Sequence, residues 1–413
     1  MNTQRKRVVV TGAAGISPIG NDWPGILARL RERRNAVQRM DEWDIYEGLN
    51  TKLAAPAAPF DLPAHYTRKV TRSMGRVAVM AVLSAEWALQ QAGLLGDPVL
   101  GSGKVGVSHG SSSGTHSAIG DFGRMLNQHT TAGITATTYI KMMSHTSPVN
   151  IGVHFGLTGR VITTSSACTS GSQGIGSAYE AIVAGKQIAM LGGGSEQLDA
   201  TASAVFDTLF ATSVRNHEPQ LTPRPFDANR DGLVLGEGAC SLLLEDLDHA
   251  RARGATILAE VAGYGSNSDG QHVTQPSAET MAQAMRLALE DAGLPPEAIG
   301  YVNAHGTATD HGDIAESHAT AQVFGANMPI SSLKSYMGHT LGACGALEAW
   351  IAIQMMREGW FAPSINLDNL DPRCATLDYI TGEGRALDVE YVMSNNFAFG
   401  GINTSLIFKR WVD

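Results

Sequence analysis

ALQQAGL at residues 88–94 returns as ALEDAGL at residues 288–294, and this repetition decides the fold. Each copy ends an amphipathic stretch with Ala-Gly-Leu, where the glycine suits the left-handed residue that follows many helices. The two copies lie 200 residues apart in a chain of 413 residues, which is close to half of its length. The sequence therefore predicts two similar units, each about half of the protein.

Other segments repeat in the same order in both halves. Short apolar strands that end in His-Gly are expected at KVGVSHGS (104–111) and GYVNAHGT (300–307). Strands that lead into a helix of small residues are expected at VITTSSAC (161–168) and PISSLKSYMGH (329–339). Late apolar strands are expected at ACSLLLED (239–246) and TSLIFKRW (404–411). Because strands alternate with helices, the sequence predicts α/β layers.

The length agrees with two fused or duplicated units, since it exceeds that of one ordinary domain. We expect the halves to be residues 1–252 and 253–413, with a boundary near residues 251–256. Residues 34–63 and 111–147 are interpreted as insertions on the first half.

The bulk composition excludes several classes of protein. A hydrophobic content of 43% with 17% charged residues suits a well-buried globular protein, and no run of eighteen apolar residues predicts a membrane span. The net charge of −9 argues against nucleic-acid binding, which needs clustered lysine and arginine. Four cysteines without a CxxC pair, and an apolar run too short for a signal peptide, predict a protein of the reducing cytoplasm.

The first apolar stretch, VVVTGAAGISPIGN at residues 8–21, resembles a nucleotide-binding loop without its spacing. A GxGxxG fingerprint that begins at Gly12 needs glycine where the sequence has Ala14 and Ser17. The related TGxxxGxG spacing fails as well, and no GxxxxGK phosphate loop is present. We therefore interpret the stretch as a buried first strand that leaves through a glycine-rich turn.

The cysteine in SSACTSGSQGIGSAYEAIVAG, residues 165–185, is the first candidate catalytic residue. Cys168 leaves a β-branched strand and enters a helix rich in glycine, serine and alanine. The free N–H groups and the positive dipole end of a helix N-terminus favour a thiolate. Most cysteines are buried structural residues, but this strand-to-helix junction favours a nucleophile.

Two histidines lie at the ends of predicted strands, where the active sites of α/β proteins gather. His305 lies in NAHGTATDHGD (303–313), and His339 lies in SLKSYMGHTLGACGALEA (332–349), five residues after Lys334. One histidine among thirteen is best interpreted as a surface or core residue, but two at similar strand ends favour catalysis. Metal binding is the alternative, and no HxxxH or clustered Cys/His spacing supports it, so we expect no metal.

A glycine pair marks the last candidate segment, SNNFAFGGINTS at residues 394–405. Gly400 and Gly401 permit a turn that could bring backbone N–H groups to a reacting carbonyl. Taken alone, the segment is best interpreted as a plain loop between strands.

These four segments, in this order, resemble the elongating β-ketoacyl-acyl-carrier-protein synthases. The resemblance covers essentially the whole chain and includes the first strand and RPFDANRDGLVLGEGA (224–239). It implies the thiolase fold, a duplicated five-layer α/β/α/β/α architecture, whose sheet contains the first strand without a cofactor. It also implies an acyltransferase that condenses malonyl-carrier protein with an acyl chain, in fatty-acid or aryl polyene/polyketide synthesis.

The resemblance also implies the catalytic roles. Cys168 accepts the acyl chain as a thioester, and His305 and His339 drive decarboxylation and stabilise the enolate. Lys334 holds the electrostatics of the site together with Glu316.

Further site residues follow from the same resemblance. Phe399 gates the acyl pocket, and its backbone N–H joins that of Cys168 in an oxyanion hole. Asp313 joins Glu316 in a structural and electrostatic role. The substrate-binding positions, of which the two threonines contact the phosphopantetheine arm, are Thr307, Thr309, Ser112, Phe397 and Gly400.

The resemblance implies no metal or organic cofactor, because substrates arrive on the phosphopantetheine arm of acyl carrier protein. Arg68, Lys69 and Arg72 in HYTRKVTRS (65–73) match the positions by which the family docks this acidic partner. By charge alone, an ordinary solvated helix face explains these residues about as well, but their clustering against a net charge of −9 favours docking.

The family is dimeric, so a homodimer is expected, with a chain-length-factor heterodimer as the alternative. The resemblance also implies that the insertions at residues 34–63 and 111–147 form the acyl pocket and dimer contacts.

The chain departs from the family pattern at several positions. Ala398 stands where the gate usually has glycine and Ile402 where threonine is common, so a stiffer gate is expected. Ser112 is small where some members carry a bulky residue, which suggests a roomier or more polar acyl pocket, and Cys344 is interpreted as a packing residue. MDEWDIYEGLNTKLAAP (40–56) is similar to synthases of aryl polyene clusters.

Two other functions stay open on the sequence. A non-catalytic chain-length partner would lack the nucleophile, so the presence of Cys168, His305 and His339 argues against it. A thiolase acting on coenzyme A esters would use a second cysteine in place of His339, and it would need no basic docking segment.

Overall fold

Eleven strands form one continuous sheet in residues 5–412, the part of the chain that the computed structural model describes. The first half of the chain contributes five neighbouring strands, in the order β5 (Val161–Thr163), β4 (Val105–Gly110), β6 (Ala189–Glu196), β8 (Gly238–Asp246) and β1 (Val8–Ile16). The second half continues the sheet with β9 (Ala259–Ser268), β16 (Ile402–Arg410), β15 (Tyr391–Ala398), β10 (Ile299–Asn303), β11 (Pro329–Ser331) and β13 (Asp378–Tyr379).

The two halves share one pairing pattern, which is the structural form of the predicted duplication. β1, β8 and β6 pair antiparallel, and β6, β4 and β5 pair parallel. In the same way, β9, β16 and β15 pair antiparallel, and β15, β10 and β11 pair parallel. The halves join where Val8 of β1 pairs with Val261 of β9 and Val10 pairs with Ala259.

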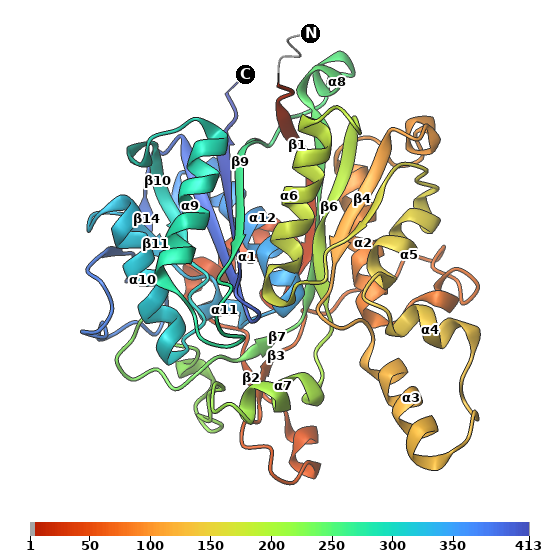
Figure 1. Ribbon diagram of the computed structural model, residues 1–413, viewed down its shortest axis with the longest axis horizontal. Coiled ribbons are helices and arrows are strands. Elements are labelled where there is room, and N and C mark those ends of the chain that lie inside the picture. The colour runs from red at the N-terminus through yellow and green to blue at the C-terminus, as the bar shows by residue number, and fades with distance from the viewer. Residues whose placement is uncertain (1–4, 413) are drawn as a thin grey trace.

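Helices cover and separate the two halves of the sheet, so the predicted five-layer architecture is confirmed. The outer face of the first half carries α2 (Arg76–Gln91) and α5 (Thr146–Phe155). The outer face of the second half carries α9 (Ala278–Ala292) and α10 (Asp310–Phe324). The middle layer, visible at the centre of Figure 1, consists of α6 (Ser170–Val183) and α12 (Cys344–Glu358).

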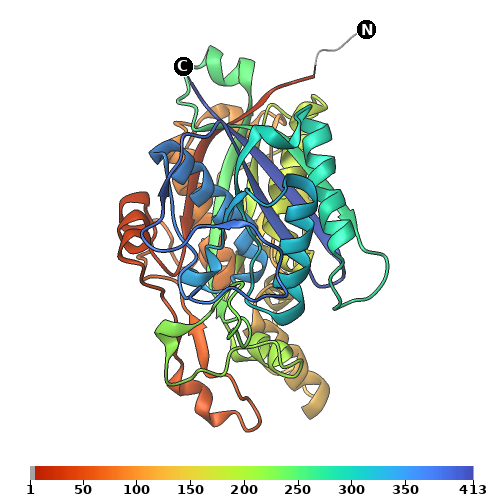
Figure 2. The ribbon, with the colours of Figure 1, turned by 90° about the vertical axis from the view of Figure 1, so that its left-hand side faces the viewer.

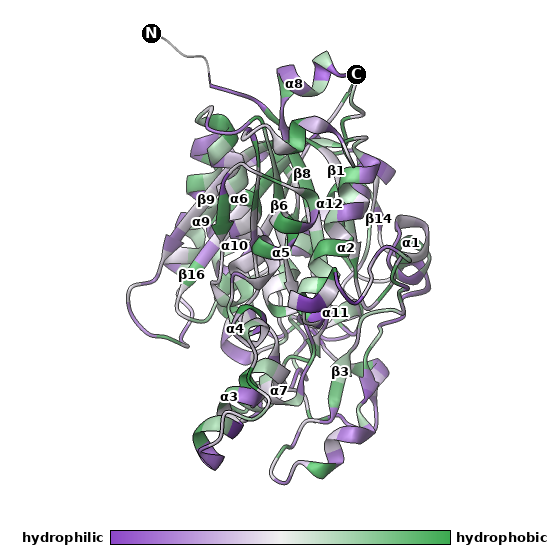
Figure 3. Cartoon of the chain, turned by 90° about the vertical axis from the view of Figure 1, so that its right-hand side faces the viewer, coloured by the Kyte–Doolittle hydropathy of each residue, from purple (hydrophilic) through white to green (hydrophobic). Residues whose placement is uncertain are grey.

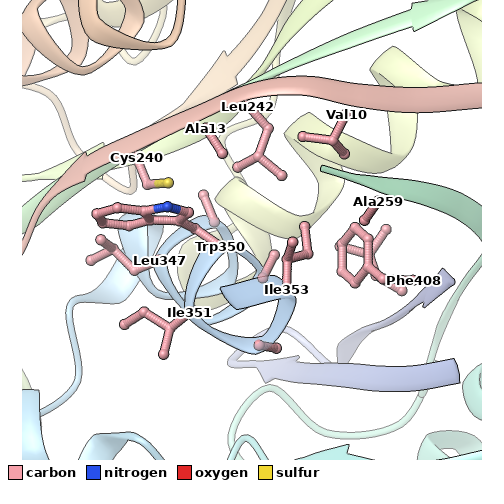
Figure 4. Close-up of a cluster of buried hydrophobic side chains, with 14 of the residues drawn as sticks. Val10, Ala13, Cys240, Leu242, Ala259, Leu347, Trp350, Ile351, Ile353 and Phe408 are labelled. Atoms are coloured by element: carbon pink, nitrogen blue, oxygen red, sulfur yellow. The ribbon is translucent and has the colours of Figure 1, made fainter. Parts of the chain in front are cut away.

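The middle helix α12 is apolar on all sides because both halves of the sheet press on it, as expected for a fully buried helix. Trp350 of α12 lies beside Cys240 of β8, while Ile353 points toward Phe408 of β16 (Figure 4). Complete burial of such side chains stabilises the fold by roughly 1.5–3 kcal/mol each. Figure 3 shows the same organisation as hydrophobic colour on the central strands and α6, with hydrophilic colour at the periphery.

Both repeated Ala-Gly-Leu segments end helices as predicted. Gly93 follows α2 with a left-handed φ of 70°, and Gly293 caps α9 with a φ of 65°. Left-handed backbone at this position costs glycine nothing, because it has no Cβ.

The glycine-rich turn predicted after the first strand is wrong in its position. Strand β1 continues through Gly12 and Gly15 to Ile16, and the chain turns only between Ser17 and Gly20. Gly12 serves packing instead, because a Cβ at this position would collide with the carbonyl oxygen of Ala88 in α2.

The two predicted insertions lie at the end of the sheet opposite the chain termini, as Figures 1 and 2 show. Residues 34–63 contain β2 (Gln38–Arg39) and β3 (Leu53–Ala55), which pair with each other, and β3 also pairs with β7 (Leu235–Gly236). Residues 111–147 contain α3 (His116–Gln128) and α4 (Ala136–Met142). The remaining elements are α1 (Trp23–Glu32), α7 (Ala200–Asp207), α8 (Leu247–Ala252), α11 (Lys334–Met337), β12 (Trp360–Phe361) and β14 (Arg385–Ala386). Among the described residues, no helix has the length and apolar character needed to cross a membrane.

Candidate active site

Cys168 occupies the strand-to-helix junction that the sequence predicted. A single 3-10 turn, Ala167–Thr169, connects β5 to α6 and carries the thiol at the N-terminus of that helix. Ala167 has a φ of 51°, a left-handed conformation that costs a non-glycine residue about 1–2 kcal/mol. Such strain concentrates at functional sites, where the surrounding structure holds it in place.

The two candidate histidines lie beside this thiol. The Nε2 atom of His339 is 3.0 Å from the Sγ atom of Cys168. The ring of His305 packs edge-on against that of His339, with ring centroids 5.2 Å apart and an interplanar angle of 88°. All three side chains are buried. The structure thus brings together the nucleophile candidate and both histidines from separate halves of the chain.

The hydrogen bonds at each Nδ1 atom fix the tautomers of these histidines. The ammonium group of Lys334 lies 3.2 Å from Nδ1 of His305 and can only donate to it. The backbone N–H of Leu341 donates to Nδ1 of His339 over 3.3 Å. Since Nδ1 accepts in both rings, a neutral imidazole carries its proton on Nε2. Both histidines therefore present N–H donors at Nε2.

Lys334 pairs with a different carboxylate from the one expected. Its buried ammonium group donates to Glu348 of α12, whose other oxygen accepts from the amide of Asn396 over 2.7 Å. Glu316 instead accepts the backbone N–H groups of His305 and Gly306, each over 2.7 Å. The ion pair of Lys334 is thus with Glu348, while Glu316 holds the strand end that carries His305 and its charge also helps to raise the pKa of Lys334.

Asp313 stabilises the neighbouring loop in a similar way. Its carboxylate accepts the backbone N–H groups of Phe226 over 2.7 Å and of Ala308 over 3.1 Å, and Arg230 lies 3.7 Å away. Ala308 has a φ of 65°, so this carboxylate holds a strained turn next to the site.

Burial determines the protonation of the catalytic cluster. Burial raises the pKa of Cys168 to about 11, although the charge of Lys334 and the backbone N–H groups of Phe399 and Cys168 act to lower it. Burial, aided by the charge of Lys334, moves the pKa of His305 and of His339 well below the ordinary value. Burial alone would lower the pKa of Lys334, but the charge of Glu348 raises it. The site consequently holds a thiol, two neutral imidazoles and one ammonium ion.

A cavity of about 570 Å³ opens onto the cluster. Its lining includes Cys168, His305 and His339 together with predicted substrate and gate residues, namely Thr307, Thr309, Phe397 and Phe399. The hydroxyl oxygens of Thr307 and Thr309 are 2.9 Å apart. Gly400 is not part of the lining, although its neighbour Gly401 is.

The ring of Phe399 closes one side of this cavity. It packs against Phe206 with ring centroids 5.3 Å apart. Its backbone N–H is one of the groups that lower the pKa of the Cys168 thiol, as expected for a donor directed at the reacting atoms. The residue before it, Ala398, ends strand β15 and also lines the cavity.

Ser112 does not line this cavity, and its place in the acyl pocket stays a prediction. Its backbone N–H and its hydroxyl both donate to one carboxylate oxygen of Glu196, over 2.8 and 2.5 Å. The N–H of Gly342 donates to the same oxygen over 3.0 Å. The other oxygen of Glu196 is buried without a partner, and burial raises the pKa of this carboxyl to about 7. No described residue of the two insertions lines the cavity.

The cluster of Cys168, His305 and His339 also has the spacing of a metal site, with one ligand atom of each within 4.8 Å of the others. The ammonium of Lys334, however, lies 3.2 Å from His305, and a positive charge at that distance opposes the binding of a cation. The absence of a metal from the reaction stays a prediction.

The predicted docking residues lie at the surface. Arg68, Lys69 and Arg72 are exposed, and among the described residues none of them forms an ion pair. They belong to a turn and the short 3-10 helix Thr71–Ser73 rather than to a helix face. Their charges are therefore available to a partner.

Sequence reasoning missed Glu348 and Asn396. A signal was present for Glu348, since it is the one charged residue in the apolar run ACGALEAWIAI at residues 343–353. A buried carboxylate needs a partner, which directs attention to the nearby Lys334.

Comparison with known proteins agrees with the geometry over the whole chain. Residues 5–250 match the model of the β-ketoacyl synthase N-terminal domain, and residues 258–368 match that of the C-terminal domain. The chain is 36% identical to 3-oxoacyl-[acyl-carrier-protein] synthase 2 of Synechocystis sp., over 99% of each sequence.

Two solved structures have the same fold. A β-ketoacyl synthase from Burkholderia phymatum is 61% identical, with a TM-score of 0.97 over 98% of this chain and 100% of that one. The ishigamide ketosynthase/chain length factor is 32% identical, with a TM-score of 0.89 over 99% of this chain and 100% of that one.

Proposed function

Because this chain belongs to the β-ketoacyl synthase family, we propose that it elongates acyl chains as a β-ketoacyl-acyl-carrier-protein synthase. It is an acyltransferase that forms a carbon–carbon bond between malonyl-carrier protein and an acyl group. The observation that carries this proposal is the contact of 3.0 Å between Cys168 Sγ and His339 Nε2, with His305 beside them in one cavity.

The first half-reaction loads the acyl chain onto Cys168. The thiol of Cys168 loses its proton, and the resulting thiolate attacks the carbonyl carbon of an acyl thioester, while the N–H groups of Cys168 and Phe399 stabilise the oxyanion that forms. Collapse of this intermediate breaks the bond to the phosphopantetheine sulfur, which takes up the proton lost by Cys168 and leaves as a thiol. The acyl group then remains on Cys168 as a thioester.

The second half-reaction forms the new bond. Malonyl-carrier protein loses CO2, and the electron pair of the broken C–C bond becomes an enolate. The Nε2–H groups of His305 and His339 donate to the enolate oxygen, since both Nδ1 atoms are acceptors. The enolate carbon attacks the acyl carbonyl, the C–S bond breaks, and Cys168 leaves as a thiolate that takes up a proton from solvent to restore the thiol.

The other site residues serve these steps. We assign Lys334 to holding the tautomer of His305, with Glu316 and Asp313 as positioning residues for the strand end and loop around it. Thr307 and Thr309 bind the phosphopantetheine arm. Phe397, Gly400 and Ser112 complete the substrate contacts through movement of the gate and of the acyl pocket.

Acyl carrier protein is the partner that delivers both substrates, so the enzyme needs no metal or organic cofactor. The exposed charges of Arg68, Lys69 and Arg72 support docking of an acidic partner. We further propose a cytoplasmic homodimer, with the ketosynthase/chain length factor relative supporting a heterodimer as the second arrangement.

The finer assignments are also proposals. We divide the chain into residues 1–252, which supply the nucleophile, and residues 253–413, which supply both histidines and the gate; the shared strand pattern supports this division. The similarity of residues 40–56 to aryl polyene synthases supports an aryl-polyenoyl chain as substrate.

Intact-protein mass spectrometry tests the proposal. Wild type and Cys168→Ala are incubated separately with carrier proteins bearing a saturated or an aryl-polyenoyl chain, and with the matching coenzyme A esters. We expect an acyl adduct on wild type alone, formed from carrier protein, and the better chain identifies the pathway. Adduct formation only from coenzyme A would favour a thiolase, and no adduct on folded protein would favour a chain-length partner.

A further inference from the structure

A second cluster of metal-binding side chains lies outside the cavity, where the loop that begins the basic segment meets α2 and α5. His65 comes from the loop, Glu86 from α2 and His154 from the last turn of α5. One ligand atom of each residue lies within 4.8 Å of the others. Three elements that are distant in sequence therefore converge on one small volume.

Both imidazoles direct Nε2 at the same carboxylate oxygen. The Nε2 atom of His65 is 2.9 Å from Oε2 of Glu86, and that of His154 is 3.7 Å from it. The second distance is too long for a hydrogen bond, so the convergence is not fully explained by hydrogen bonding. An ion placed between the three atoms would contact all of them.

Glu86 lacks a permanent positive partner. Its side chain is 8% exposed, and among the described residues its only ion-pair partners are His65 and His154. Both are neutral unless protonated, while a buried carboxylate is costly without a compensating charge. A bound cation would supply that charge.

The donors suit a transition metal of the zinc class. Two imidazole nitrogens and one carboxylate oxygen form a set that binds Zn²⁺ and leaves a fourth position for water.

The surroundings hold the ligands in place. The hydroxyl of Tyr66 donates to Oε2 of Glu86 over 2.9 Å, as a second layer of hydrogen bonding does around many metal ligands. The ring of Tyr66 packs against both imidazoles, with centroids 4.8 Å from His65 and 5.1 Å from His154, and the two imidazole centroids are 6.3 Å apart. His65 itself is half exposed, which gives an ion access from solvent.

We propose that His65, Glu86 and His154 form a binding site for one divalent ion of the zinc class. The ion ties the loop that carries the basic docking residues to two helices of the outer layer. It acts apart from the acyl-transfer chemistry, since none of its ligands lines the catalytic cavity.

Zinc binding to purified full-length protein tests this site. The catalytic cluster is removed as a competing site by working in Cys168→Ala, and Zn²⁺ alone is titrated by calorimetry. Co²⁺ is titrated in parallel, because its visible absorption reports the number and geometry of ligands. Each test variant carries His65→Ala or Glu86→Gln in addition to Cys168→Ala. The matched control carries His217→Ala in the same background, which removes an exposed histidine outside the cluster.

We expect one Zn²⁺ per chain in Cys168→Ala and in its His217→Ala control. We expect His65→Ala and Glu86→Gln to weaken binding by at least about tenfold and to change the Co²⁺ spectrum. His65 is exposed enough for its alanine variant to fold, which circular dichroism checks. The metal site would be overturned if Zn²⁺ did not bind saturably to Cys168→Ala, or if its affinity were the same with and without His65→Ala. The cluster would then be only a hydrogen-bonded network around Glu86.

Discussion

The ammonium group of Lys334 lies 3.2 Å from Nδ1 of His305, which leaves Nε2 as the donor that faces the reacting atoms. Lys334 thus determines which nitrogen of the histidine carries the proton. The charge that does so is itself held by Glu348 in the buried middle layer.

Loss of this charge will harm decarboxylation more than acylation. Replacing Lys334 alone would leave the buried carboxylate of Glu348 without a compensating charge, at a cost of about 3–5 kcal/mol of stability. The double variant Lys334→Met/Glu348→Gln removes both charges, and we expect CO2 release from malonyl-carrier protein to fall by about 10²–10³-fold, as when an oxyanion donor is lost. Acylation, measured by mass, should fall less; equal losses in both half-reactions would contradict the tautomer role.

The reactivity of Cys168 will rise steeply with pH. Burial raises the pKa of this thiol to about 11, so its thiolate fraction grows about tenfold per pH unit between about pH 7 and pH 9. His305 and His339 have lowered pKa values and add no transition in this range. The rate of iodoacetamide alkylation measures this dependence, with Cys168→Ala as control. A rate that is already level near pH 7 would indicate a thiolate stabilised by a histidinium.

Glu196 makes the protein less stable as pH rises. Burial raises its pKa from the ordinary 4.5 to about 7, so the folded state holds the proton more tightly than the unfolded state does. Its stabilising contribution is complete below about pH 4.5 and is lost as pH rises through 7, by on the order of 3 kcal/mol. Glu196→Gln keeps an acceptor for Ser112 and should reduce the fall in Tm over this range. An unchanged pH profile would show that Glu196 does not titrate there.

Two neighbouring glycines provide a matched test of the gate. Gly400 and Gly401 both have left-handed φ values, of 91° and 69°, so alanine strains either position by about 1–2 kcal/mol. A Cβ at Gly401 would also lie 2.8 Å from Cβ of Asp269, whereas one at Gly400 meets nothing within 4 Å. We expect Gly401→Ala to lower both Tm and the acylation rate more than Gly400→Ala, because the clash displaces Phe399. Equal effects would mean that backbone strain alone matters.

Charge reversal of the basic segment will affect carrier-bound substrates selectively. We expect the triple variant Arg68→Glu/Lys69→Glu/Arg72→Glu to raise KM for acyl-carrier protein by about tenfold or more and to remove much of its salt dependence. Alkylation of Cys168 by iodoacetamide should stay unchanged, since the variant leaves the cavity intact. An unchanged KM would exclude these residues from docking.

The sequence predicted those parts of the fold and site that depend on local patterns. Apolar runs predicted the strands, and the glycines after α2 and α9 predicted the helix ends. Cys168, His305 and His339 each stand at a strand end that is visible in the sequence, and the structure brings them together.

The contacts between distant segments could not be predicted from the sequence. The resemblance paired Lys334 with Glu316, whose charge does act on Lys334, but only the packing of α12 against β15 reveals the direct ion pair with Glu348. In its local sequence Gly12 is typical of a turn, whereas in the fold its lack of a Cβ permits α2 to approach β1 closely. Ser112 has its hydroxyl committed to Glu196, on the strand β6, and no local pattern reveals that partner.

The separation of 171 positions between Cys168 and His339 also orders events during synthesis of the chain. At a typical rate of 5–20 residues per second, the ribosome covers this separation in roughly 10–30 s. Throughout this time the nascent chain carries its thiol without His339 beside it, and α6 lacks the cover of α12. The cysteine is thus made first and becomes a catalyst last, when the final third of the polypeptide folds over it.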